Sequence, residues 1–109
     1  MAKNADLLQG TLDLLVLKAL LLGPLHGWAI TKRLARLSDD VLNVGQGSLY
    51  PALYRLEDQE WISAEWGVSE EGRRTKTYTL TVLGRKQLAA ERSTWRRFAA
   101  AVEQVLHAS

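Results

Sequence analysis

A chain of 109 residues with 47% hydrophobic and 24% charged residues is long enough for one domain with a modest core, and its composition excludes disorder. It contains no cysteine, which excludes disulfide bonds, thiol catalysis and cysteine-based zinc sites. The net charge is only +2, but the positive charges are segregated, which fits a polyanionic partner as well as it fits a solvated surface. Because no signal-peptide pattern is present and the longest apolar run is too short to span a bilayer, the sequence predicts a cytoplasmic protein with no membrane partner.

The first nine residues are expected to be a short lead-in, and Thr11 is expected to cap a first helix that runs to Leu22. Its apolar residues form two nearly opposite faces. One face consists of Leu12, Leu15, Val16 and Ala19, and the other of Leu14, Leu17 and Leu21. A helix that is apolar all round is buried on both sides, and in so small a domain a second chain is the simplest cover. We therefore expect the second face to lie at a dimer interface.

A second helix is expected over residues 27–37, because Gly23 and Pro24 end the first. Residues 38–40 are typical of a turn, and residues 41–45 are expected to be extended and able to add a short strand. A third helix is expected over residues 48–59, with Ser48 as its N-cap and Pro51 in its first turn. Three helices with a short connection between the last two form a helix-turn-helix arrangement.

The third helix has an apolar stripe of Leu49, Leu53 and Leu56 and an unusual opposite face. Where a solvated helix normally carries Glu and Lys, this face offers hydroxyls, aromatic edges and a guanidinium, which can bond base edges and phosphates. The helix dipole near its N-terminus also favours an anion. The alternative is an ordinary core helix with two surface tyrosines. We interpret the third helix as a recognition helix. It is expected to contact DNA through Gln46, Ser48, Tyr50, Tyr54 and Arg55.

Two alternating segments, residues 61–66 and 76–81, flank a polar stretch bounded by glycines, which predicts a β-hairpin with a long loop. A helix-turn-helix followed by a two-stranded hairpin is a winged helix, whose wing touches the DNA backbone. Basic residues of the second helix and of the wing are expected to bind phosphates, although plain surface charge would explain each one singly. These residues are Lys32, Arg33, Arg36, Arg73, Arg74 and Lys76.

Thr81 is expected to cap a last helix over residues 82–106, roughly 37 Å long. Apolar residues repeat along it at heptad spacing, which suggests pairing between chains, while packing onto the first helix is the alternative. We expect both at once. The residues assigned to the dimer interface on this helix are Leu88, Trp95, Phe98, Val102, Val105 and Leu106. The fold class is therefore α+β, mostly α: a winged helix-turn-helix over residues 1–81 and a C-terminal dimerisation helix over residues 82–109.

The segments GTLDLLVLKAL at residues 10–20 and GSLYPALYRLE at 47–57 carry a family resemblance, with matching residues at 26–27, 61–62, 65–67, 73–74, 78, 80–81 and 84. On these, the chain resembles the PadR family of winged-helix transcriptional regulators over nearly its full length. The resemblance implies a homodimeric DNA-binding repressor of the small subfamily, and its two-fold symmetry implies a pseudo-palindromic operator. Two residues depart from the family pattern: Trp28 replaces a frequent Tyr, and Glu60 replaces a frequent Gly, so the third helix lacks its usual left-handed stop.

The resemblance also implies an effector site, since small relatives can bind flat aromatic compounds between paired tryptophans. Here Trp95 and Phe98 would line it, and the alternative is that Trp95 is simply packed core. The two histidines, His26 and His107, have no Ser-Asp partners and cannot form a His-rich metal site. No catalytic residue, cofactor or metal is therefore expected. The alternative to a DNA-binding regulator is a winged-helix protein-interaction module that does not bind DNA.

Overall fold

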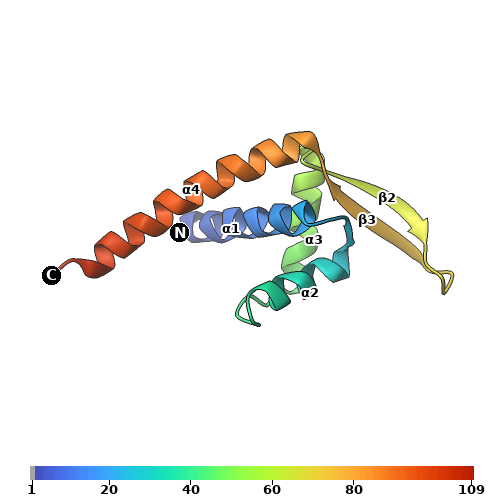
Figure 1. Ribbon diagram of the computed structural model, residues 1–109, viewed down its shortest axis with the longest axis horizontal. Coiled ribbons are helices and arrows are strands. Elements are labelled where there is room, and N and C mark those ends of the chain that lie inside the picture. Colours follow the sequence, from blue (N-terminus) through green and yellow to red (C-terminus); the bar gives the residue numbers. More distant parts are fainter. Residues whose placement is uncertain (1) are drawn as a thin grey trace.

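The computed structural model describes the backbone of residues 2–109 and the side chains from residue 10 onward. Its elements in chain order are α1 (Ala2–Leu21), β1 (Leu25–His26), α2 (Gly27–Leu37), α3 (Gln46–Asp58), β2 (Ile62–Val68), β3 (Arg74–Leu80) and α4 (Val82–His107). The molecule is elongated, 60 × 28 × 27 Å. In Figure 1, α4 runs alongside α1 and extends past it at one end, while the β2–β3 hairpin projects from the other end. None of the helices in the described part of the chain is long and apolar enough to cross a bilayer.

The sheet is antiparallel, with strand order β1-β3-β2. The hairpin pairs Ile62 with Leu80 at its base and Val68 with Arg74 near its tip, as the alternation predicted. The third strand is not the expected segment 41–45, which forms no strand. Instead Leu25 pairs with Tyr78 on the free edge of β3, because the chain leaves α1 directly beside that edge. The segment 41–45 serves as the connection between α2 and α3.

The core lies where α1, α2, α3 and the base of the hairpin meet. The predicted α3 stripe is confirmed, since Leu49, Leu53 and Leu56 are all buried. The other large buried side chains are Val16, Leu17, Leu20, Ile30, Leu34, Ile62, Tyr78 and Leu88. Removing most of this apolar surface from water is the main source of stability.

Helix α1 differs from the expectation at two points. It begins well before Thr11, which is inside the helix and is not its cap. Leu17 and Leu88 were both assigned to a dimer interface, but they are buried within the chain, at 0% and 8% exposure. The reason is that α4 covers one side of α1 while α2 and α3 cover the other. Leu14 and Leu21 stay only half-buried.

Helix α3 begins two residues earlier than expected. The Gly45 carbonyl accepts the N–H groups of Ser48 and Leu49, at 3.1 and 3.0 Å. Gly45 is therefore the N-cap, with no side-chain hydrogen bond, and Ser48 lies in the first turn. Pro51 consequently lies in the second turn, where it cannot donate to the Gly47 carbonyl, which solvent can reach at this exposed position.

The left-handed stop at the end of α3 is present after all. Glu60 adopts a φ of +63°. The Trp61 N–H donates to the Leu56 carbonyl at 3.0 Å and the Glu60 N–H donates to the Glu57 carbonyl at 2.9 Å. This pair of bonds is the Schellman motif that usually has glycine at the left-handed position. Glu60 adopts it at a conformational cost that glycine would not have.

The end of α3 is joined to the start of α4 at a small junction formed by Glu60, Trp61, Thr81 and Gly84. Thr81 caps α4 as predicted, because its Oγ1 accepts the Gly84 N–H at 3.0 Å. The same hydroxyl donates to the Glu60 carbonyl at 2.7 Å, and the Thr81 N–H donates to the Trp61 carbonyl at 3.1 Å. A Cβ atom on Gly84 would lie 2.0 Å from the Trp61 oxygen, so any other residue there would have to displace main chain. The junction therefore holds α3 and α4 in one relative orientation.

Candidate nucleic-acid interface

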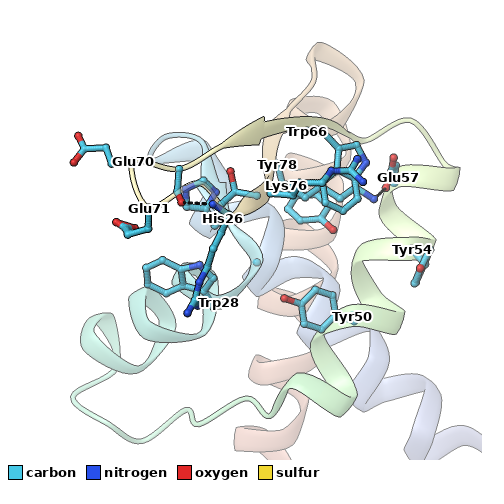
Figure 2. A pocket seen from close by; sticks show the side chains of 15 residues that line it. His26, Trp28, Tyr50, Tyr54, Glu57, Trp66, Glu70, Glu71, Lys76 and Tyr78 are labelled. Carbon is cyan, nitrogen blue, oxygen red and sulfur yellow. Dashed lines mark hydrogen bonds and ion pairs between the residues drawn. The ribbon is translucent and has the colours of Figure 1, made fainter.

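The outer surface of α3, the start of α2 and the inner face of the hairpin enclose a groove of about 760 Å³, which we call the wing groove (Figure 2). Its aromatic lining consists of His26, Trp28, Tyr50, Tyr54, Trp66 and Tyr78. Its charged lining consists of Glu57, Glu70, Glu71, Arg73, Arg74 and Lys76. The groove thus lies between α3, the predicted recognition helix, and the β2–β3 hairpin, the predicted wing.

The outward face of α3 carries the polar and aromatic groups that were expected there. Gln46 and Ser48 are exposed in the first turn, Tyr54 is 72% exposed, and Tyr50 is 37% exposed. Tyr50 is placed by Gly27, because a Cβ atom at Gly27 would come within 2.8 Å of the Tyr50 hydroxyl oxygen. Gly27 was not predicted to belong to the site. The one signal for it in the sequence was that Gly27 is among the residues that carry the family resemblance.

Arg55 does not present a free guanidinium. Its Nη2 donates to Asp13 Oδ1 on α1 at 2.8 Å, and its Nε is buried without a hydrogen-bond partner among the side chains described from residue 10 onward. Asp13 is itself buried. Burial raises the pKa of Asp13, and Glu91 raises it further, while the Arg55 guanidinium acts in the opposite direction. Arg55 therefore connects α3 to α1, which leaves its guanidinium less available to DNA than the exposed side chains of α3.

Lys76 is likewise occupied within the protein. Its ammonium lies 3.4 Å from Glu57 Oε1 and between 5.5 and 6.0 Å from the ring centroids of Tyr54, Trp66 and Tyr78. Partial burial lowers the pKa of Lys76, but Tyr78, Glu57 and Tyr54 together raise it by more, so the amine stays charged. Burial raises the pKa of Tyr78 and keeps its hydroxyl neutral. Lys76 thus has partners that do not require a phosphate.

The remaining predicted phosphate contacts fall into two groups. Arg33 donates from Nη1 to the Ala19 carbonyl near the end of α1 at 3.1 Å, so its charge is committed to a helix C-terminus. Four other basic residues are exposed: Lys32 and Arg36 on α2, and Arg73 and Arg74 on the hairpin. Lys32 lies 4.9 Å from the ring centroid of Trp28, and Arg74 lies 4.5 Å from that of Trp66, but both cations stay open to solvent.

His26 lies at the edge of the sheet, with its Nδ1 3.2 Å from Thr77 Oγ1 and its ring stacked on Trp28 at a centroid distance of 6.0 Å. His107 lies at the exposed end of α4, 3.4 Å from Glu103. Within the part of the chain whose side chains are described, no three His, Asp or Glu residues lie close enough together to hold a metal ion.

The predicted effector residues lie midway along α4 and do not line the wing groove. The rings of Trp95 and Phe98 are 6.0 Å apart, and both side chains are about 40% exposed within the single chain. They border a shallow apolar cleft of about 230 Å³ between α1 and α4, which Leu14 also lines. Three of the residues assigned to dimer contact, Leu14, Trp95 and Phe98, thus line an open apolar cleft.

Comparison with known proteins agrees with this architecture. Residues 16–90 match the description "Transcriptional regulator PadR-like family". Among solved structures, a transcriptional regulator from Clostridium thermocellum has 26% identity and a TM-score of 0.82, covering 91% of this chain and 96% of that one. A PadR family transcriptional regulator from Eggerthella lenta has 29% identity and a TM-score of 0.78, covering 99% of this chain and 92% of that one.

Two sequence relatives were also found. One is an uncharacterized protein X of Lysinibacillus sphaericus, 28% identical over 84% of this chain and 84% of its own length. The other is a 37.1 kDa protein of transposon TN4556 in Streptomyces fradiae, 39% identical over 83% of this chain but only 24% of its own length. The family match covers more than half of the chain, and similar structures share its winged helix and long last helix. The chain therefore belongs to the PadR-like family of transcriptional regulators.

Proposed function

We propose that this chain is a DNA-binding transcriptional repressor that acts as a homodimer on a pseudo-palindromic operator. The observation that carries the proposal is the exposed polar and aromatic face of α3, next to a hairpin whose exposed Arg73 and Arg74 line the wing groove. An α-helix fits the major groove of B-DNA, and a wing reaches the flanking backbone. Family membership supports the same function.

On this proposal, base edges are read by the outward residues of the first half of α3, namely Gln46, Ser48, Tyr50 and Tyr54. Phosphates are bound by the exposed basic residues Lys32, Arg36, Arg73 and Arg74. Phosphate contacts set register and affinity but carry no sequence information, so specificity depends on α3.

The second copy would cover the exposed apolar side chains of α4 and the adjoining face of α1. These are Trp95, Phe98, Val102, Val105 and Leu106, with Leu14 and Leu21. A row of large apolar groups along a helix of 26 residues is typical of a surface that another helix covers. Two-fold pairing through this surface would place two recognition helices on half-sites one or two helical turns apart.

The same surface supports a small planar aromatic compound as the effector that releases the repressor. The support is the apolar cleft beside Trp95 and Phe98, two ring systems that a flat ligand could stack on. A variant with Trp95 as its single tryptophan would report binding by fluorescence quenching. No response to a panel of planar aromatics would favour the alternative, in which Trp95 only packs against the partner chain.

The main experiment is selection of bound sequences from random DNA, which yields the motif, its symmetry and the half-site separation together. Enrichment of an inverted repeat is the expected result. No enrichment, with binding equally weak on all DNA at two salt concentrations, would favour the winged-helix interaction module without DNA binding.

Two variants then separate base reading from phosphate binding on the selected operator. Tyr50→Ala is expected to weaken operator binding far more than non-specific binding, whereas Arg73→Ala is expected to weaken both and to reduce the salt dependence. Equal losses on both DNAs for Tyr50→Ala would remove Tyr50 from base readout. Sedimentation equilibrium of the wild-type chain tests the dimer, and a monomer at working concentration would contradict it.

A further inference from the structure

Five side chains from three elements converge at the floor of the wing groove. Lys76 on β3 is the direct cross-strand partner of Trp66 on β2, and Tyr78 follows two residues later on the same face of β3. Tyr54 and Glu57, one helical turn apart on α3, complete the group (Figure 2). We call Lys76 with Tyr54, Glu57, Trp66 and Tyr78 the lysine cage.

The cage satisfies the ammonium group of Lys76 without any ligand. One carboxylate lies at 3.4 Å, and three aromatic rings lie within the range in which a cation is attracted to a ring. The Lys76 side chain is 25% exposed. A charge that is already paired with Glu57 adds little net attraction for a phosphate, in contrast to the exposed guanidinium of Arg73.

The cage is also where the outer hairpin is attached to α3. Toward its tip the hairpin has no core of its own, since residues 65–68 and 70–74 are all exposed. Of the ion pairs in the part of the chain with described side chains, Lys76–Glu57 alone joins the hairpin to α3. An isolated two-stranded hairpin is at best marginally stable in water, so its position depends on such an attachment.

We propose that Lys76 is a positioning residue that clamps the wing to the recognition helix through the lysine cage, and that it is not a phosphate contact. The clamp fixes the distance between the exposed Tyr54 on α3 and the arginines of the wing, so that both meet one duplex in a single register. This inference rests on the proposed DNA-binding function. Its structural half, the attachment of the hairpin, does not depend on DNA.

The first test measures hairpin opening without DNA, by amide hydrogen exchange in the full chain. Lys76→Met keeps the aliphatic stem but removes the charge, and Glu57→Gln removes the partner. Both are expected to accelerate exchange of the hairpin amides by about fivefold, as the loss of contacts worth roughly 1 kcal/mol would do. Arg73→Met, an exposed cation on the same hairpin, is the matched control and should change little. Unchanged exchange in both cage variants would overturn the clamp.

The second test uses the selected operator and random DNA at several salt concentrations. A phosphate contact predicts that Lys76→Met lowers the salt slope by about 0.9 and weakens binding to all DNA, as expected for Arg73→Met. The clamp predicts an unchanged slope for Lys76→Met and about a tenfold loss of affinity on the operator alone.

Glu57→Gln gives the sharpest contrast, because it makes the protein more positive. If Lys76 simply attracts phosphate, this variant binds all DNA more tightly. The clamp predicts instead that Glu57→Gln loses operator preference just as Lys76→Met does. A gain on all DNA with the operator preference intact would overturn the clamp. If the wild-type chain binds no DNA, the proposed function fails, and hydrogen exchange alone then decides whether the cage holds the hairpin.

Discussion

Replacing Gly84 with alanine tests whether the junction between α3 and α4 is as tight as the structure describes. The new Cβ atom would lie 2.0 Å from the Trp61 carbonyl oxygen and 2.6 Å from Leu80 Cδ1. Leu80 can change rotamer, but the carbonyl is main chain and also accepts the Thr81 N–H at 3.1 Å. The start of α4 must therefore move away from the start of β2 by more than an ångström.

The steric cost of Gly84→Ala opposes the gain in stability that alanine usually gives over glycine in a helix. Alanine in a helix interior is about 1 kcal/mol more favourable than glycine. Overpacking against atoms that cannot rotate away costs about 1–3 kcal/mol, and a weakened backbone hydrogen bond costs about 1 kcal/mol more. The net loss is about 2 kcal/mol in the free energy of unfolding. For a chain of this length that loss lowers the melting temperature by roughly 8 °C.

The assay is urea unfolding at one fixed chain concentration, since association would otherwise alter the apparent stability. Gly47→Ala is the matched control, because Gly47 is also helical but a Cβ atom there meets nothing within 4 Å. The control should be as stable as wild type or slightly more stable. If Gly84→Ala unfolds at the same urea concentration as Gly47→Ala, the reasoning about the junction is refuted.

Three further predictions concern other unusual positions. Glu60→Gly should raise the free energy of unfolding by about 1 kcal/mol, because glycine adopts a φ of +63° without strain, while Glu60→Ala should give no such gain in the same urea assay. Because burial raises the pKa of Asp13, the folded chain holds that proton more tightly than the unfolded chain, and stability falls as pH rises from about 3.9 through the higher folded-state pKa. Asp13→Asn removes that loss, so its stability relative to wild type should rise over this acidic window in urea titrations and stay level above it; a relative decrease would contradict the assignment. Gly27→Ala should displace the Tyr50 ring and weaken operator binding severalfold in an anisotropy titration, with little change in unfolding; unchanged affinity would show that the position of Tyr50 does not matter for binding.

Local sequence signals were sufficient for much of the fold. Helix α2 has the predicted bounds, the leucine stripe of α3 is buried, the hairpin pairs as expected, and Thr81 caps α4. Each of these features depends on periodicity or on a capping residue within a few positions. The two-residue strand β1 is too short to show any periodicity, so it was missed.

The candidate site was less predictable, because its charges are paired through tertiary contacts. Asp13 and Arg55 are 42 residues apart in the chain, and Glu57 and Lys76 are 19 apart. In the sequence around Arg55 and around Lys76, nothing distinguishes a cation that is free to bind DNA from one that is paired within the protein. Leu17 was misassigned for a related reason: the sequence predicted that the last helix packs onto α1 as well as onto a partner chain, but it did not show that Leu17 is fully buried within the single chain.

The exposed C-terminal end of α4 makes the proposed pairing depend on the concentration of the protein. Every residue from 101 to 109 is exposed, including Val102, Val105 and Leu106. These residues end the 26-residue helix α4 where it extends past α1, and their apolar side chains stay in water within the single chain. In the proposed dimer, burial of these side chains and association would be one event that varies with the square of the chain concentration. A scarce, unpaired chain would then leave these apolar side chains in water, so the amount of paired regulator would rise more steeply than the amount of chain.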